Sequence, residues 1–197
     1  GKIQLGYPVS RYIPEFKDLK VGIEKADAAT GQKELVLVPP DREMTVQDLL
    51  RHTSGITYGI FGKSMVKDTY NIKDGNPFNF NQTNAEMVTK LSKLPLQYQP
   101  GTTWDYSMST DVLGRIVEVA SGLELDAFIA ERITKPLKLS DTGFWAEGEK
   151  RVMRLAEPQV DPTTGKRPAL FHDSLQRPTW IAGGAGMIST AADYARF

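Results

Sequence analysis

A tyrosine in a loop ahead of a helix is the residue of this sequence best suited to chemistry. Tyr106 lies in the stretch Pro100–Gly114, which opens with a Pro-Gly turn signal. Ser109 then predicts the N-cap of a helix with apolar residues at helical spacing. A phenol has a pKa of about 10, so it trades protons with a hydroxyl only where its surroundings lower that pKa. A nearby ammonium group is the usual cause. The stretch alone leaves two interpretations, an acyl-transfer site or a tyrosine that packs the loop against the helix.

A second candidate is the Ser-x-x-Lys sequence formed by Ser64 and Lys67. Its spacing suits a nucleophile and a base one helical turn apart. The segment follows a turn at Gly59–Gly62 and precedes a polar run, and no sustained apolar face is available to bury a helix beneath a cleft. We therefore interpret Ser64 as a residue outside the catalytic machinery.

The histidines carry no metal motif. His52 and His172 lie far apart in the sequence, and the chain has no cysteine for a disulfide or a thiolate site. His172 stands beside Asp173 in a charged stretch, which is typical of a solvated turn, and no Gly-x-Ser-x-Gly elbow exists to serve the pair. The sequence predicts neither a metal nor a cofactor.

Composition excludes several classes of partner. The 197 residues include 24 basic and 24 acidic side chains, without long runs of one sign, so neither nucleic acid nor an anionic membrane surface is implied. No apolar stretch approaches the roughly 20 residues that a membrane-spanning helix needs. A hydrophobic content of 40% is enough to build a core.

The elements that must position Tyr106 are mostly helical. Val21–Ala26 and Glu34–Val38 predict a hairpin that ends at Pro39. Capping residues and apolar spacing predict helices that begin at Thr45, run from Thr83 to Leu94, follow Ser109, run from Leu125 to Ile133, and begin at Thr190. Residues 73–82 and 147–177 are polar or proline-interrupted and predict surface segments.

Four stretches together carry a resemblance to a known family: Gly1–Pro14, Met44–Gly55, the Tyr106 stretch continuing through Pro136–Phe144, and Gly183–Phe197. In series they resemble the serine β-lactamase and penicillin-binding-protein superfamily, and within it the esterase-like branch called family VIII carboxylesterases. The resemblance implies an α+β, β-lactamase/transpeptidase-like fold. This chain would cover mainly the helical subdomain with a small β-hairpin.

The resemblance also implies residues that are not here. The family uses a Ser-x-x-Lys nucleophile helix, a Tyr-Ser or Tyr-x-Asn motif and a third motif on a strand edge, and only the second is present. We therefore expect residues 1–197 to be the central part of one domain of a longer protein. The nucleophile helix would lie upstream and the third motif downstream, so the isolated segment would be inactive.

For the site, the resemblance implies that Tyr106 shuttles the serine proton. Met108 stands where β-lactamases usually have an asparagine, and a thioether cannot donate a hydrogen bond to a substrate amide. This departure favours ester substrates against an apolar wall. Ser107 would contact substrate or only cap backbone groups, and Tyr58 and Ala185 would line the cleft.

Three further features, a histidine, a glycine loop and a tryptophan, are given structural interpretations. His52 begins the His-Thr-Ser-Gly sequence, which we expect to seal the C-terminus of the preceding helix through a glycine cap at Gly55. Gly183, Gly184 and Gly186 predict a turn that side chains would not permit. Trp180 is expected to anchor the core, with a cleft wall as its alternative.

The resulting hypothesis is a serine hydrolase that cleaves carboxylic esters through an acyl-serine intermediate. The alternatives are a β-lactamase or D-alanyl-D-alanine carboxypeptidase, and a catalytically silent binding or structural relative. The expected partner is a small-molecule ester or β-lactam. A signal peptide ahead of residue 1 would place the protein in the periplasm or outside the cell, and otherwise it would be cytoplasmic. The sequence leaves this and the oligomeric state open.

Overall fold

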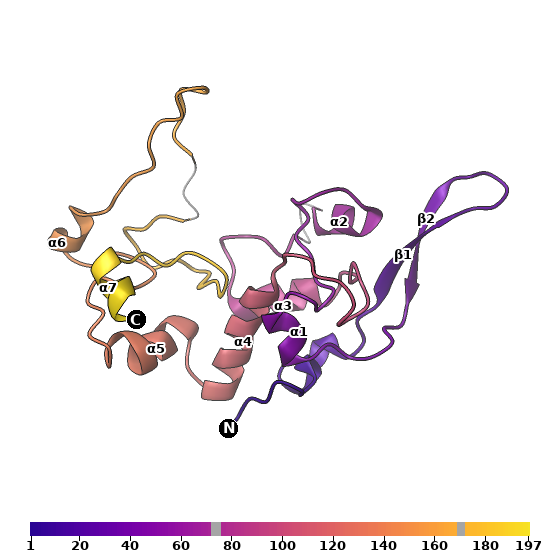
Figure 1. Ribbon diagram of the computed structural model, residues 1–197, viewed down its shortest axis with the longest axis horizontal. Helices are drawn as coiled ribbons and strands as arrows, with labels where there is room; N and C mark the ends of the chain where they lie inside the picture. Colours follow the sequence, from indigo (N-terminus) through magenta and orange to yellow (C-terminus); the bar gives the residue numbers. More distant parts are fainter. Residues whose placement is uncertain (72–75, 169–171) are drawn as a thin grey trace.

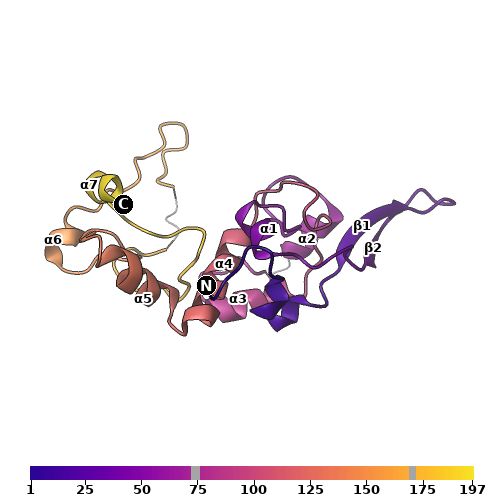
Figure 2. The same cartoon turned by 60° about the horizontal axis from the view of Figure 1, so that its bottom comes forward.

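Helices in the middle of the molecule separate a projecting hairpin from a second group of helices (Figures 1 and 2). The computed structural model describes residues 1–71, 76–168 and 172–197. The strands are β1 (Val21–Ala26) and β2 (Lys33–Val38), and the helices are α1 (Val46–Leu50), α2 (Met65–Tyr70), α3 (Asn84–Leu91), α4 (Ser109–Ser121), α5 (Leu125–Ile129), α6 (Glu149–Val152) and α7 (Ala191–Arg196). Single turns of 3-10 helix cover Val9–Arg11 and Pro14–Phe16.

The predicted hairpin is confirmed, and β2 begins one residue earlier than expected. Its antiparallel register pairs Val21 with Val38 and Ala26 with Lys33. At its base, the Gly22 N–H donates to the Leu96 carbonyl at 2.9 Å. Only this base is buried, so the hairpin is held to the body at one end and its tip projects into solvent (Figure 1).

The predicted capping boxes at Thr45 and Thr83 both form, with Asp48 and Glu86 as the reciprocal partners. Helix α3 ends at Leu91 and not at Leu94. The physical reason is Pro95, because a residue before proline is disfavoured in the helical region. The chain therefore leaves α3 through tighter turns before it reaches the hairpin base.

The prediction of Ser109 as an N-cap is wrong by one residue. Met108 occupies the N-cap position and Ser109 is already helical. The Ser109 hydroxyl lies 2.8 Å from the hydroxyls of both Ser54 and Ser107, so it is used in tertiary contacts and not in capping.

The C-terminus of α1 also differs from prediction. His52 itself takes the left-handed conformation, at φ +53°. Its N–H donates to the Leu49 carbonyl and the Thr53 N–H donates to the Asp48 carbonyl, which is the Schellman arrangement. Gly55 also has a positive φ, of +85°, but it does not end the helix. Glycine is needed there because a Cβ would lie 2.2 Å from the Tyr98 carbonyl oxygen.

The core runs beneath the central helices. Trp180 is buried in it as predicted, and its indole N–H donates to Asn84 Oδ1 at 3.0 Å. The other fully buried large side chains include Leu49, Ile56, Met87, Leu91, Met108, Val112 and Ile116. A smaller cluster of Leu125, Phe144 and Ile181 lies under α5.

The C-terminal third contains the elements expected there. The helix from Leu125 continues through a π-helical turn at Ala130–Thr134 before Pro136, and α7 begins after the Thr190 cap. His172 is not part of a solvated turn, since its Nε2 donates to the Phe144 carbonyl at 2.7 Å. Residues 72–75 and 169–171, which overlap the predicted surface segments 73–82 and 147–177, lie outside the described residues.

The glycine loop at residues 183–186 is tighter than the sequence indicated. Only Gly186 needs a positive φ, at +92°. Gly183 is required by close approach instead, since a Cβ there would lie 2.3 Å from the Thr110 carbonyl oxygen. A Cβ on Gly184 would make a tight contact, 3.1 Å from Asp111 Oδ2. The loop therefore packs directly on the first turns of α4.

This packing makes a testable prediction. We expect Gly183→Ala to lower the free energy of unfolding by about 1–3 kcal/mol, because the methyl group overpacks against α4 backbone. The matched control is Gly6→Ala, where a Cβ would meet nothing within 4 Å. Chemical denaturation of both variants is the measurement, and equal midpoints would contradict the close approach.

Candidate active site

Two segments far apart in the sequence lie side by side around Tyr106. The Asp105 N–H donates to the His52 carbonyl at 3.0 Å, and the Gly101 N–H donates to the Thr53 carbonyl at 2.7 Å. The Thr57 hydroxyl adds a bond to Asp105 Oδ2 at 2.7 Å. The loop before α4 is thus fixed against the segment that follows α1.

Tyr106 lies at the surface of this contact with 47% of its area exposed. Three rings surround it, with centroid distances of 5.0 Å to His52, 5.4 Å to Tyr58 and 6.0 Å to Phe61. Trp104 packs edge-on to His52 and is 66% exposed. The phenol is therefore accessible at the centre of an aromatic surface, a placement that suits a proton-transfer group.

The side chains of Ser107 and Met108 do not share this surface. Each is only 1% exposed, Met108 within the core and Ser107 against Ser109. The expectation that they contact substrate does not match their placement, because the chain turns inward as it enters α4. Phe61 and Trp104 supply the apolar surface near Tyr106 in their place.

Tyr58 lies beside Tyr106 but is half-buried. Its hydroxyl donates to Asp111 Oδ2 at 3.3 Å, and its ring packs edge-on to Phe61 and Phe78. Burial and the nearby Asp111 carboxylate raise the pKa of the Tyr58 phenol well above its ordinary value. Tyr58 therefore stays protonated and acts as a hydrogen-bond donor.

Asp111 is the site residue that sequence reasoning missed. It lies in the first turn of α4, where an acidic residue is ordinarily explained by the helix dipole. Here the carboxylate is 2% exposed and accepts a bond from the Gly184 N–H at 3.0 Å as well as the bond from Tyr58. Burial raises its pKa, and these two bonds act in the opposite direction.

Ala185, which the resemblance would place near substrate, is exposed. With the glycines around it, it lines a hollow of about 510 Å³. The other walls come from α4, α5 and the π-helical turn after α5, among them Leu113, Phe128 and Ile133. Its link to Tyr106 runs through Gly184, Asp111 and Tyr58. The structure thus brings the rings of Tyr58 and Tyr106 together and joins the Ala185 loop to Tyr58 by hydrogen bonds through Asp111.

Ser64 and Lys67 have other partners. Ser64 is the N-cap of α2, accepting from the Lys67 backbone N–H at 3.0 Å and donating to Gln97 at 2.5 Å. The Lys67 amine donates to the Phe61 carbonyl and lies 3.6 Å from Asp105. The Ser-x-x-Lys spacing is thus explained by helix capping and an ion pair.

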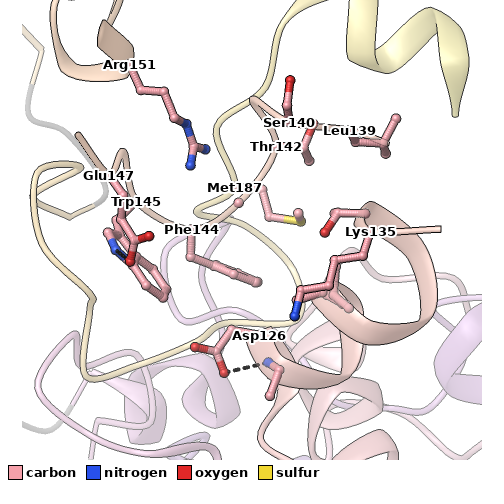
Figure 3. Close-up of a pocket in the computed structure, with 15 residues that line it drawn as sticks. Asp126, Lys135, Leu139, Ser140, Thr142, Phe144, Trp145, Glu147, Arg151 and Met187 are labelled. Atoms are coloured by element: carbon pink, nitrogen blue, oxygen red, sulfur yellow. Dashed lines mark hydrogen bonds between the residues drawn. The ribbon is translucent and has the colours of Figure 1, made fainter. Parts of the chain in front are cut away.

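A separate hollow of about 350 Å³ lies between α5 and the segment 139–151 (Figure 3). Its apolar side is formed by Phe144, Trp145 and Met187, and charged groups of both signs face it, including Arg151 and Asp126. No sequence-predicted site residue is among the described residues that line it.

Metal ligands do not gather in the described part of the chain: no group of three or more His, Cys, Asp or Glu side chains is arranged to hold an ion. Within residues 1–71, 76–168 and 172–197, no helix has the length and apolar character needed to cross a bilayer.

The fold and the Tyr106 motif together define a β-lactamase-like protein. Residues 1–197 match the sequence model of the family described as Beta-lactamase. The chain belongs to this family, in its esterase-like branch, and it has the β-lactamase/transpeptidase-like fold.

The relatives include proteins named as esterases, acyltransferases and putative D-alanyl-D-alanine carboxypeptidases. Esterase EstB from Burkholderia gladioli is 30% identical over 100% of this chain and 50% of its own length, and Protein Rv1367c from Mycobacterium tuberculosis is 32% identical over 100% and 47%. EstCE1, a hydrolase with promiscuous acyltransferase activity, superposes with a TM-score of 0.72 at 25% identity, over 99% of this chain and 51% of that protein. The chain spans about half the length of the curated relatives it matches.

The buried Asp111 carboxyl predicts a pH dependence of stability. Because its pKa is raised on folding, its contribution to stability is present below the pKa of the unfolded chain, about 3.9, and is lost as pH rises through the folded value. Asp111→Asn keeps an acceptor for Gly184 and removes the charge. We expect the variant to lose this pH dependence in denaturation curves recorded across the acidic range.

Asp111→Ala is the contrasting variant. It leaves the Tyr58 hydroxyl and the Gly184 N–H without their acceptor, which costs about 1–3 kcal/mol. The alanine variant is therefore expected to be less stable than the asparagine variant throughout the neutral range. Equal stability of the two would show that these hydrogen bonds do not hold the loop to α4.

Proposed function

We propose that the whole protein cleaves carboxylic esters through an acyl-serine intermediate, with Tyr106 in proton transfer. The observation that carries the proposal is the exposed phenol of Tyr106 in the loop that enters α4, in a chain of the β-lactamase family with an esterase among its relatives. Residues 1–197 would form the central part of one domain. The serine and its lysine would come from a part of the protein outside them.

This reaction requires a group that first accepts the proton of the serine hydroxyl and then donates a proton to the leaving group. In acylation, Tyr106 would act as a phenolate stabilised by the ammonium group of the lysine: the serine oxygen attacks the ester carbonyl carbon and its proton passes to the phenolate oxygen. The phenol so formed then gives a proton to the alkoxide oxygen of the leaving group as the C–O bond breaks. Water then repeats the sequence to release the acid. Tyr106 is exposed enough to reach both partners, and the contacts with residues 52–58 hold its loop in place.

The surroundings of Tyr106 support an apolar ester as substrate. Phe61 and Trp104 are both exposed beside it, so an acyl or alcohol group could pack on their rings. Met108 stands where β-lactamases have an asparagine. Its thioether cannot donate a hydrogen bond to a lactam amide, and its side chain is buried away from the surface around Tyr106. β-Lactamase or carboxypeptidase activity is the weaker candidate among enzyme functions. The non-enzymatic alternative is a catalytically silent protein with a binding or structural role.

Tyr106→Phe in the whole protein tests the proposal. Removing one hydroxyl should lower kcat for a chromogenic ester by about 10²–10⁴-fold, the usual worth of an acid–base group. The wild type should also acquire a single phosphonate adduct, read by intact mass, on a serine outside residues 1–197. Faster cleavage of a chromogenic cephalosporin than of the ester would favour the lactamase, and no adduct and no turnover would favour the silent relative.

Ser64→Ala separates the two serine candidates. The variant should lose about 1 kcal/mol of stability, because it removes the α2 N-cap. It should keep both ester hydrolysis and the phosphonate adduct. If the adduct disappears or maps to Ser64, the interpretation of this serine as a capping residue is wrong.

A further inference from the structure

His52 occupies a backbone position that costs energy for most side chains. It is left-handed, at φ +53°, at the end of α1, where glycine is the usual residue and asparagine the next. In the described part of the chain, Lys138 is the other non-glycine residue with a positive φ. A histidine is expected at such a position only where the contacts of its side chain offset the energetic cost of the backbone conformation.

His52 contacts both neighbours of Tyr106, one through its backbone and the other through its side chain. Its carbonyl accepts the Asp105 N–H at 3.0 Å, and its Nδ1 accepts the Ser107 N–H at 3.3 Å. Its ring lies 5.0 Å from the Tyr106 ring, at an angle of 42°. His52 therefore holds the backbone on each side of Tyr106 and one face of its ring.

A line of buried hydroxyls leads to the same nitrogen. Ser54 and Ser109 lie 2.8 Å apart, Ser109 and Ser107 lie 2.8 Å apart, and the Ser107 hydroxyl lies 3.3 Å from His52 Nδ1. A nitrogen that accepts a backbone N–H carries no proton of its own. The consistent arrangement has each hydroxyl donate to the next, from Ser54 to Nδ1, so the ring proton of His52 is on Nε2.

Each hydroxyl in this line then donates one hydrogen bond, and Nδ1 accepts from both the N–H and the hydroxyl of Ser107. Ser54 accepts the Ile56 N–H at 3.2 Å at the far end, and Ser54, Ser107 and Ser109 are all buried. A buried network with a single direction fixes its members more firmly than isolated bonds do. Burial also lowers the pKa of His52, which favours the neutral ring that the network requires, although Asp105 acts in the opposite direction.

We propose that His52 is a positioning residue: through Nδ1, and backed by the serine hydroxyls of residues 54, 107 and 109, it fixes the loop that presents the Tyr106 phenol. The inference rests on the proposed function of Tyr106. It assigns to the His-Thr-Ser-Gly sequence a part in the reaction in addition to ending α1.

His52→Gly in the whole protein is the informative variant. Glycine suits the left-handed position, so α1 still ends normally and folding is preserved, whereas the acceptor and the ring are lost. We expect kcat for the chromogenic ester to fall by about 10–100-fold with little change in KM, because the phenol is no longer held in its reacting geometry. Lys138→Gly is the matched control, since it makes the same backbone change on an exposed loop, and it should leave kcat unchanged.

His52→Asn tests the acceptor itself. Asparagine tolerates the left-handed conformation and places Oδ1 close to the position of Nδ1, so it should restore most of the kcat that His52→Gly loses. The tautomer of His52 can be measured independently of enzyme activity. Nitrogen NMR of the wild type should find Nδ1 of His52 unprotonated and Nε2 protonated.

The outcomes separate this proposal from the one on which it rests. A wild type without esterase activity, or a fully active Tyr106→Phe variant, would overturn the proposed function. An inactive Tyr106→Phe variant beside a fully active His52→Gly variant would overturn the role of His52 alone. A His52→Asn variant as impaired as His52→Gly, or a proton on Nδ1, would overturn it as well.

Discussion

The contact between residues 52–58 and the loop that enters α4 is the constraint on which the candidate site depends. It is made largely of polar groups that water does not reach, including Ser54, Ser107 and Ser109. Buried hydroxyls are costly unless each is paired, so the two segments have one arrangement that satisfies all of them. The exposed position of Tyr106 follows, because its inward-facing neighbours leave its ring outside.

The first turn of α4 also receives the glycine loop, and this second contact is steric. Gly183 lies against the backbone of α4 with no room for a Cβ, and this approach brings the Gly184 N–H within reach of the buried Asp111. The same carboxylate accepts from Tyr58, so three segments meet at one helix end. The site is therefore built around the N-terminal end of α4, with Trp180 and the core beneath it.

Much of the fold was predictable because its signals are local. The hairpin, the capping boxes at Thr45 and Thr83, and the burial of Trp180 follow from residue types at short spacing. The errors occur where a distant segment intervenes. Ser109 looked like an N-cap because serine commonly is one, but its hydroxyl is used by Ser54, a residue 55 positions away in the chain.

The sequence by itself determined the family, the helices and strands near Tyr106, and the choice of Tyr106 as the candidate catalytic residue. These features depend on the order of motifs and on local capping residues, which can be read directly from the sequence. The tertiary structure decided which neighbours share its surface: Met108 and Ser107 are buried, Phe61 and Trp104 are exposed, and Asp111 and His52 join the segments. Burial and hydrogen-bond partners depend on segments that meet only after folding, so no local pattern specifies them.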